Sequence, residues 1–567
     1  MKKTGKRKNQ PAAYRPPRRA MELFLLLSLV AAGLYYEPAG CAASLFLTGY
    51  ILWCVQKRGA LLLPKTATLP AVTVIWLCYG LTALWGVDRG MAWLGFVKFM
   101  PLPLFALAAA QMDRTQRREL LRLLPVTGAV MVPATWALGQ IPALGTYFLV
   151  GGRLAGTFQY PNTFALFLLL GVIVLADRAR WDVRRMLCLA SLMAGIFLSG
   201  SRTTLALLLA AVIALGVMAR ERKTRLLLWG MLAALLAAAG LYAALTGDLS
   251  TVGRYLTASA GASTFLGRLL YFRDALPVIL RHPFGLGYMG YFYAQGGFQT
   301  GVYSVANIHN ELLQLLLDVG WLPTALALFA VVKSLLPGQN SRLGRMLVLA
   351  ICAHSLFDFD LQFVALGFVL LLAMDLEREE TTPFRAEGLM VTAGCAVVCL
   401  SLYFGAASGL YYAHAYEAAA TLYPGYTGAW LQLLPQAADA AEMDRLADRV
   451  LKQNRSAALA YDAKARAAYA DGDIQAMIEY KQQAIALAKY ALEEYLDYFD
   501  MLAVGVQLYE QAGDRASADY CRACLRSIPD MLARTLEDTS PLAWRIDDKP
   551  SLTLPEPYRQ RLEALTM

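Results

Sequence analysis

Long apolar runs recur through residues 21–409 of this 567-residue chain, and they limit its folds more than any other feature. A helix needs about 20 mostly apolar residues to cross a bilayer, within a range of roughly 17–25. The chain is 57% hydrophobic and only 17% charged, whereas soluble domains carry about 25% charged residues. These properties exclude a water-soluble globule and favour a polytopic membrane protein.

Thirteen of these runs are candidate spans, which predicts an all-α fold with about 12–13 transmembrane helices. They lie at residues 21–36, 38–55, 68–86, 91–110, 122–143, 161–176, 185–199, 203–219, 226–246, 310–332, 344–359, 361–376 and 387–409. The first run lacks a small-residue cleavage site, so we expect a signal anchor there. The runs on either side of Ser199 and Phe359 fit full spans or re-entrant helices.

Charge divides the chain into three parts. Residues 1–20 hold eight Lys or Arg and no acid, residues 21–409 hold 28 basic and 19 acidic residues, and residues 410–567 hold 16 basic and 23 acidic residues. In the middle part, 20 of the 28 basic residues fall in alternate loops, which is the pattern of cytoplasmic loops. We therefore predict a basic cytoplasmic tail at 1–20, a transmembrane domain at 21–409 and an extracytoplasmic domain at 410–567.

The C-terminal domain carries a short repeat. Gly472-Asp473 recurs as Gly513-Asp514, 41 residues later, and helical patterns rich in Ala, Leu and Tyr flank each pair. This arrangement is typical of tetratricopeptide-like helical hairpins, whose usual period is about 34 residues. Such repeats offer a binding surface, so we expect an envelope protein partner there. An irregular helical bundle is the alternative.

One predicted extracytoplasmic loop, residues 247–308, contains Arg but no Lys and leads into His309. An ionisable group at membrane depth is costly and is by default a functional candidate. An imidazole can also accept or donate a proton near neutral pH. His309 is therefore the first candidate catalytic residue, and His354, which lies inside an apolar run, is a weaker one.

Four arginines of the predicted outer face form a second set: Arg153, Arg202, Arg268 and Arg273. A planar guanidinium matches phosphate and carboxylate geometry, so the set predicts an anion site. Contact with lipid head groups is the alternative. Nearby, Asp358-Phe-Asp360 has the DxD form that metal-dependent sugar transferases use, although two acids that cap a helix give the same string.

Four motifs follow one another along the chain. They are Arg153-x2-Gly-Thr-Phe-x2-Pro-Asn162; Ser199-x-Ser-Arg202; Arg268-x4-Arg273 with His282-Pro-Phe-Gly-Leu-Gly-Tyr288 and His309-Asn310-Glu; and Ala353-His354-Ser-Leu-Phe-Asp358. In order and sidedness these motifs resemble the O-antigen ligase and polymerase superfamily. The resemblance covers roughly residues 150–360, while the repeat domain resembles a variable appendage.

The resemblance implies transfer of a glycan from a polyprenyl-pyrophosphate carrier, such as undecaprenyl pyrophosphate, to an acceptor hydroxyl outside the cytoplasm. It implies an inverting glycosyltransferase that uses neither a metal nor a cofactor. Its catalytic residues would be His309, which handles the acceptor proton, and Arg273 and Arg202, which contact the pyrophosphate. The substrate-binding residues by the same analogy are Arg153, Arg268, Asn310, Asn162 and Tyr288, and His354 and Asp358 form a second tier.

Several functions fit this resemblance. Ligation, polymerisation and protein O-oligosaccharide transfer differ in their acceptor, which is a glycan, a lipid or a protein. A lipid-linked glycan flippase and an envelope-assembly scaffold are the competing classes. Transporters usually show internal repeats and ionisable groups near the midplane, whereas the polar motifs here gather at one interface. We expect a multi-pass protein of the cytoplasmic (inner) membrane whose partners are membrane lipid and lipid-linked glycan, and not nucleic acid.

Overall fold

The computed structural model describes residues 15–177, 182–218 and 263–566, together with a few single positions between 226 and 237. Helices dominate these residues, and the strands among them form two small two-stranded sheets. The predicted all-α class is therefore confirmed. The candidate span at 226–246 lies almost wholly outside the described residues, as do the start of the long loop and the basic residues near position 222.

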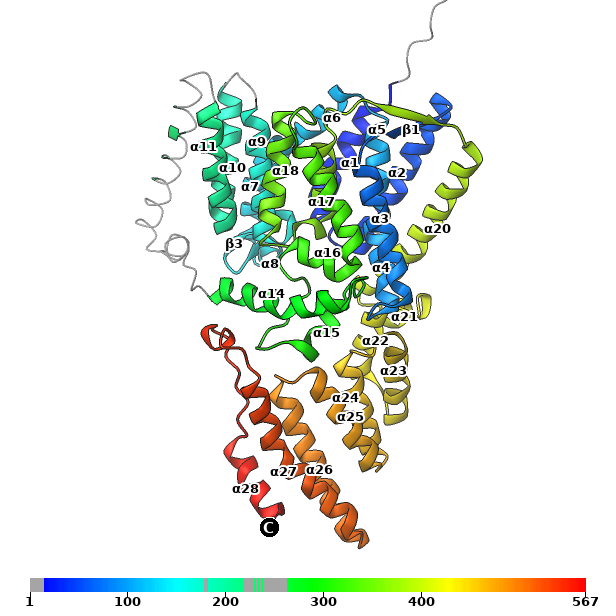
Figure 1. Ribbon diagram of the computed structural model, residues 1–567, viewed down its shortest axis with the longest axis vertical. Helices are drawn as coiled ribbons and strands as arrows, with labels where there is room; N and C mark the ends of the chain where they lie inside the picture. The colour runs from blue at the N-terminus through cyan, green and yellow to red at the C-terminus, as the bar shows by residue number, and fades with distance from the viewer. Residues whose placement is uncertain are drawn as a thin grey trace, which may run out of the picture.

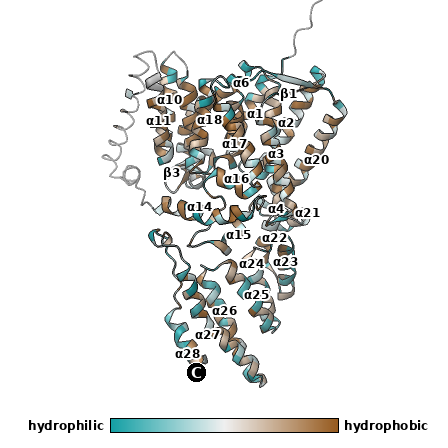
Figure 2. Cartoon of the chain, viewed as in Figure 1, coloured by the Kyte–Doolittle hydropathy of each residue, from teal (hydrophilic) through white to brown (hydrophobic). Residues whose placement is uncertain are grey.

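Most residues up to Tyr412 form an upright bundle of mainly apolar helices (Figures 1 and 2). Its helices are α1 (Arg18–Val30), α2 (Glu37–Arg58), α3 (Thr68–Leu81), α4 (Arg89–Phe99), α5 (Pro101–Ala110), α6 (Arg114–Leu121), α7 (Leu123–Gly139), α9 (Pro161–Ala176), α10 (Val183–Ser199), α11 (Arg202–Met218), α16 (Glu311–Val319), α17 (Trp321–Leu335), α18 (Arg342–Ser355), α19 (Val364–Met374) and α20 (Glu387–Tyr412). Shorter elements join them: η1 (Ala32–Leu34), η2 (Thr82–Leu84), α8 (Gly145–Phe148), β2 (Leu149–Val150), β3 (Arg153–Leu154), η3 (Gly156–Phe158) and η4 (Asp360–Gln362).

Four helical stretches among the described residues are long and apolar enough to cross a membrane: Glu37–Arg58, Arg89–Ala110, Arg114–Gly139 and Glu387–Tyr412. Apolar helices of 10–17 residues occupy several other predicted spans. One difference from the prediction is clear at 310–332, where the structure has two helices, α16 and α17, in place of one. The apolar pattern runs on across this break, so periodicity alone does not reveal it.

Backbone contacts with the segment before α15 fix the break between α16 and α17. Gly320 has a φ of 87°, a value that favours glycine, and a Cβ there would lie 2.2 Å from the carbonyl oxygen of Pro283. The Trp321 amide donates to that same carbonyl at 2.9 Å, and the Gly287 amide donates to the carbonyl of Asp318 at 3.0 Å. The glycine-rich segment before α15 thus fixes the point at which α16 ends.

The loops predicted to be cytoplasmic meet at one end of the bundle. Strand β1 (Leu61–Pro64) pairs antiparallel with β4 (Thr381–Phe384). Glu377 forms salt bridges with Arg114 and, at 2.5 Å, with Arg118. Loops that the charge pattern assigns to one side therefore lie together on one side.

The other end of the bundle is covered by two helices, α14 (Ser263–Arg281) and α15 (Gly290–Phe298). The sequence predicted a loop across 247–308, whereas the described part of it is largely helical. Helix α14 lies across the bundle rather than along it (Figure 1). Arg268 on this helix is thereby held beside the ends of the upright helices.

The C-terminal domain extends beyond this end as successive helices (Figure 1). They are α21 (Tyr416–Leu422), α22 (Thr427–Leu433), η5 (Leu434–Gln436), α23 (Ala440–Gln453), α24 (Ala458–Ala470), α25 (Ile474–Leu487), α26 (Leu492–Ala512), α27 (Arg515–Glu537), η6 (Ala543–Arg545) and α28 (Glu556–Thr566). The hydrophobic core of the bundle continues through α21–α24 as far as Ala463, and a separate core begins at Ala465. The first helices of this domain are therefore anchored on the bundle.

The two Gly-Asp pairs are hairpin turns. Gly472 and Gly513 have φ values of 79° and 75°, which end the preceding helices in the left-handed region. Asp473 caps α25 by accepting from the Ala476 amide, and Asp514 caps α27 in the same way. The repeat seen in the sequence is therefore a repeated helical hairpin, and its assignment to the tetratricopeptide class stays a prediction.

Candidate active site

Asp358 is the centre of a polar cluster at the end of the bundle that α14 covers. It lies between α18 and α19 and is 2% exposed. Its carboxylate accepts from the Tyr160 hydroxyl and from the Asn162 amide, both at 2.7 Å. Arg268 Nη2 lies 3.4 Å from Oδ2, and His309 Nδ1 lies 3.3 Å from Oδ1. Three distant segments of the chain thus meet at one buried carboxylate.

His309 is held by an unusual backbone and by aromatic rings. Its φ of 52° is uncommon for a residue with a side chain. The imidazole lies edge-on to Phe359, with ring centroids 5.0 Å apart, and its centroid is 6.1 Å from that of Tyr271. The side chain is 19% exposed. Because Nδ1 faces Asp358, the tautomer with the proton on Nδ1 is favoured and Nε2 is left as the acceptor.

The next residue, Asn310, is a helix cap. Its side-chain oxygen accepts from the Leu313 amide at 3.0 Å, and its side-chain nitrogen donates to the Leu356 carbonyl at 2.9 Å. An Asn at this position satisfies one of the free amides of the first helical turn. Asn310 therefore fixes the start of α16 directly after His309.

The arginines occupy different places around the cluster. Arg268, on α14, brings its guanidinium to Asp358. Arg153 Nε donates to the Ser199 carbonyl at 2.7 Å, and its Nη2 donates to the Asn162 amide oxygen. Arg202 begins α11 just after this turn. Arg153 and Asn162 therefore connect the cluster to the turn that carries Arg202.

Arg273 points away from the cluster. It is exposed, and its guanidinium donates to the hydroxyl of Ser540 in the C-terminal domain. The next residue, Asp274, accepts hydrogen bonds from the Thr300 amide at 2.8 Å and from the Tyr303 hydroxyl at 3.0 Å. This part of α14 thus holds the loop and the C-terminal domain together.

A second polar group lies behind the first. His354 is fully buried, with Nδ1 2.7 Å from Asp360 and Nε2 3.0 Å from the Thr204 hydroxyl. Asp360 also accepts from Thr163 at 2.8 Å and from Ser355 at 3.0 Å. Both ring nitrogens of His354 are engaged, so this histidine connects α18 to α11.

The two carboxylates of the DxD string have different partners. Asp358 accepts from groups around His309, and Asp360 accepts from groups around His354. Within the part of the chain that the structure describes, no group of three or more His, Cys, Asp or Glu side chains is placed to hold a metal ion. The two carboxylates therefore fix neighbouring segments of the chain through hydrogen bonds.

Tyr288 belongs to a separate buried group. Its hydroxyl donates to Glu37 at 2.7 Å and accepts from Lys98 Nζ at 3.2 Å. The Tyr412 hydroxyl donates to the other oxygen of Glu37 at 2.7 Å. Lys98 also lies over the ring of Tyr35, 4.6 Å from its centroid. This group joins α2, α4 and α20 beneath the segment that precedes α15.

Some of these residues were missed by the sequence reasoning. Tyr160 lies within a quoted motif but is not distinguished by spacing. Glu37 and Lys98 are charged residues at the start and in the interior of apolar runs, which is a recognisable signal of a functional or paired group. The resemblance places Asp358 in a second tier, whereas in the structure four side chains of the cluster contact it.

Tyr271 borders the cluster on α14. Burial raises the pKa of Tyr271, and the charge of Arg268 only partly opposes this effect. The phenol therefore stays protonated through the neutral range and is a hydrogen-bond donor. Together the cluster offers guanidinium groups, a phenol and an imidazole nitrogen at one edge of an apolar bundle, which is a set suited to an anionic ligand that reacts with a hydroxyl.

Comparison with known proteins bears on this arrangement. The family model described as O-antigen ligase matches residues 186–329. Comparison with curated proteins gave no match. The matched segment runs from α10 to α17 and contains Arg202, Arg268 and His309. The similarity supports the O-antigen ligase superfamily and, with the apolar helices, a membrane protein that takes part in glycan transfer for cell-envelope polysaccharide.

Proposed function

We propose that this protein transfers a glycan from a polyprenyl-pyrophosphate carrier to an acceptor hydroxyl at the end of the bundle that carries α14. The observation behind this proposal is that Arg268 and His309 meet at Asp358. The arginine can stabilise negative charge that grows on a leaving group. The partly exposed imidazole can take a proton from an incoming hydroxyl.

In the proposed reaction the acceptor oxygen attacks the anomeric carbon on the face opposite the pyrophosphate. The bond between that carbon and the pyrophosphate oxygen breaks, and its electron pair leaves with the pyrophosphate. The hydroxyl proton passes to His309 Nε2, and Asp358 orients the ring and stabilises the imidazolium that forms. Attack from the opposite face gives an inverted anomeric centre.

The proposed pyrophosphate contacts are the arginines. A guanidinium binds phosphate through two parallel hydrogen bonds, and this charge makes a metal ion unnecessary for the proposed step. We place Arg268 first because it already lies in the cluster, with Arg202, Arg153 and Arg273 as the further members of the set.

The remaining site residues have proposed positioning roles. Asn162 holds Arg153, Asn310 fixes the helix start beside His309, and His354 connects α11 to α18. Tyr288 acts through the buried Glu37 group.

We propose an apolar cavity of the bundle as the place for the carrier chain. This cavity of about 270 Å³ is lined by residues of α3, α17 and α19, and Glu311 and Gln362 lie at its polar part. Glu311 is two residues after His309 and accepts from the amides of Leu361 and Gln362, at 2.6 and 3.1 Å. A polyprenyl chain in this cavity would have its head group beside the cluster.

The C-terminal domain is proposed to be a tetratricopeptide-like extracytoplasmic module that also receives an envelope protein, on a chain set in the inner membrane. Its repeated Gly-Asp hairpins support the class. The predicted cytoplasmic loops lie at the opposite end of the bundle, which supports the sidedness.

A deletion strain tests the function. Loss of the gene should trap glycan on the lipid carrier: long chains if the protein is a ligase, and single units if it is a polymerase. Purified protein should then release polyprenyl pyrophosphate from a defined donor only when an acceptor is present. A strain without trapped glycan, or release independent of acceptor, would contradict the proposal.

A further inference from the structure

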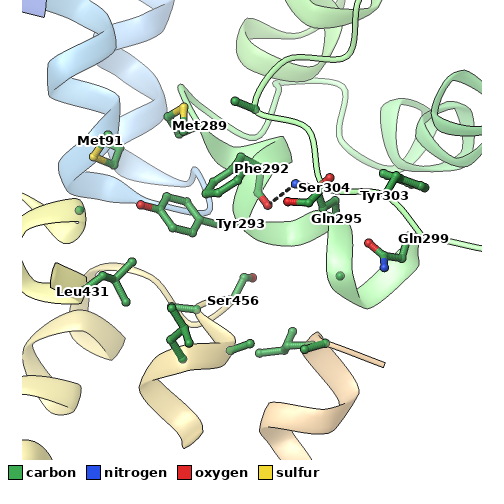
Figure 3. Close-up of a pocket in the computed structure, with 18 of the residues that line it drawn as sticks. Met91, Met289, Phe292, Tyr293, Gln295, Gln299, Tyr303, Ser304, Leu431 and Ser456 are labelled. Atoms are coloured by element: carbon green, nitrogen blue, oxygen red, sulfur yellow. Dashed lines mark hydrogen bonds between the residues drawn. The ribbon is translucent and has the colours of Figure 1, made fainter. Parts of the chain in front are cut away.

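A cavity of about 880 Å³ lies between the membrane bundle and the C-terminal domain, apart from the Asp358 cluster. Its walls come from α4, α15 and the loop at 302–306 on one side, and from α22, α24 and the end of α25 on the other (Figure 3). Sites for small ligands commonly enclose roughly 300–1,000 Å³ and carry a few polar groups in an apolar lining. The cavity has the size of such a site.

Among the described residues, the lining is rich in tyrosine and contains no basic residue. Eight tyrosines line the cavity, among them Tyr293, Tyr303 and Tyr426. Gln299, Gln432 and Ser456 add amide and hydroxyl groups, and neither Lys nor Arg is among the described residues that line it. The described lining therefore offers a pyrophosphate no cationic partner. A sugar does have partners there, because its C–H face stacks on the negative face of an aromatic ring and its hydroxyls pair with amides.

Two buried polar groups are directed to this cavity. Gln299 is 7% exposed and lines the cavity, and no hydrogen bond to another described residue engages its side-chain amide. This amide, with two donors and an acceptor, is therefore available to a ligand in the cavity. Glu37 also lines the cavity and accepts from the hydroxyls of Tyr288 and Tyr412. A carboxylate has about four acceptor positions, so it can accept further hydrogen bonds.

The cavity is joined to the Asp358 cluster through a series of rings. Tyr303 lines the cavity, and its ring centroid is 5.2 Å from that of Tyr271. The centroid of Tyr271 is in turn 6.1 Å from that of His309. A ligand that stacks on Tyr303 would therefore be separated from His309 by one ring, that of Tyr271.

We propose that this cavity binds a saccharide through ring faces and hydroxyls, and so selects the glycan that reacts at His309. The proposal rests on the glycan transfer proposed above and adds the substrate-recognition site, which the C-terminal domain completes. The saccharide is either the acceptor glycan or the outer sugars of the donor, since both offer the same chemistry.

Direct binding tests the site without requiring turnover. The probe is the glycan released by mild acid from the lipid-linked donor of cells that carry this gene, titrated calorimetrically into the purified full-length protein. Gln299→Ala and Tyr293→Ala should each weaken binding about tenfold, as expected for loss of one good contact. Ser456→Trp should abolish binding by filling the cavity. Unchanged affinity in all three variants would overturn the proposal.

Matched variants separate recognition from misfolding. Tyr293→Phe keeps the ring and should lose less affinity than Tyr293→Ala does. Tyr520→Ala removes a tyrosine that is 54% exposed on α27, outside the cavity, and should bind as the unmodified protein does. Binding should also be insensitive to salt, because the described residues that line the cavity include no Lys or Arg. Affinity that falls steeply with salt would contradict a site that works through rings and hydroxyls.

Kinetics identify the source of the saccharide and keep the two proposals distinct. In Tyr293→Ala, a raised KM for the acceptor alone identifies the acceptor glycan, and a raised KM for the donor alone identifies the donor sugars. His309→Ala should lose transfer yet keep glycan binding. If the cavity variants lose glycan binding while even the unmodified protein fails to transfer glycan from a polyprenyl pyrophosphate, the cavity proposal stands and the proposed function fails. If transfer proceeds and the cavity variants bind normally, only the cavity proposal fails.

Discussion

His309 Nδ1 lies 3.3 Å from Oδ1 of Asp358, a residue 49 positions further along the chain. The contact joins the end of the loop over the bundle to the turn between α18 and α19. It leaves Nε2 directed to substrate in the proposed reaction, while Arg268 approaches the other oxygen of the same carboxylate. The pairing is the arrangement by which a carboxylate fixes the tautomer of a general base.

His309→Ala should therefore lower kcat by roughly 10²–10⁴-fold, the usual contribution of a general base. Donor affinity should stay within about twofold because the arginines are unchanged. Transfer from a defined polyprenyl-pyrophosphate glycan and a separate donor-binding measurement check both values. His282→Ala is the control, since the side chain of His282 is exposed and His282 comes just before Pro283, whose carbonyl contacts Gly320. Equal activity in the two variants would remove His309 from the mechanism.

Asp358→Asn should impair the same step through His309. The amide retains the shape of the carboxylate but cannot stabilise an imidazolium, so kcat should fall at least about tenfold. In a protein that already carries His309→Ala, Asp358→Asn should add little, because groups that act as a unit are not additive. The four kcat values form the test. Independent, multiplying losses would show that Asp358 acts on the fold rather than on His309.

The sequence located most of the bundle because the apolar runs are long and local. It did not reveal the break at Gly320, since the run continues through it and the break depends on Pro283, which lies 37 positions earlier. The sequence predicts a loop where α14 lies, because this segment contains fewer apolar residues than the predicted spans do. Its fold depends on contacts with the bundle and with the C-terminal domain.

In the candidate site, too, the sequence indicates the residue types but not the long-range contacts. Arg268, Asn162 and His309 were singled out by residue type, and the structure brings them together at Asp358. Arg273 has the same residue type and lies only five positions from Arg268, yet it binds Ser540, 267 positions away. A contact over that separation leaves no local pattern in the sequence.

Arg268→Lys should raise the donor Kd more than Arg273→Lys does. Lysine keeps the charge but loses the planar fork, and that change is not conservative at a bidentate site. Arg268 lies beside the carboxylate cluster, whereas Arg273 faces Ser540. Loss of one charge-assisted hydrogen bond corresponds to about tenfold or more in affinity. Donor binding to both purified variants decides the order, and a larger loss in Arg273→Lys would reverse our assignment.

Transfer should survive removal of divalent cations. The Asp358 and Asp360 carboxylates already accept from different protein groups, and the proposed pyrophosphate contacts are guanidinium groups. Activity measured after treatment with EDTA should stay within about twofold of the untreated value, where a metal-dependent step would lose several kcal/mol of stabilisation. Restoration of lost activity by Mg²⁺ or Mn²⁺ would make the DxD string a metal site and would contradict the proposed mechanism.

Lys481→Met should destabilise the C-terminal hairpins while leaving the bundle intact. Lys481, on α25, is fully buried; its ammonium binds Asp462 on α24 and lies 2.6 Å from Glu494 on α26. Burial alone would raise the pKa of Asp462, yet Lys481 and Arg466 hold it below its ordinary value. Removal of the cation leaves these carboxylates facing one another, and breaking a buried pair costs about 3–5 kcal/mol. Because Arg466 remains bound to Asp462, we expect the lower end of that range.

Pulse proteolysis of the full-length protein in increasing urea, followed through a tag at the C-terminus, measures this loss. Lys452→Met is the matched control: Lys452 is exposed at the end of α23, so its free energy of unfolding should change by no more than about 0.5 kcal/mol. Equal midpoints for Lys481→Met and the unmodified protein would show that the three helices pack without help from the ammonium. A fall in midpoint accompanied by weaker glycan binding would instead tie the stability of these hairpins to the cavity that they help to enclose, since the end of α25 forms part of its wall.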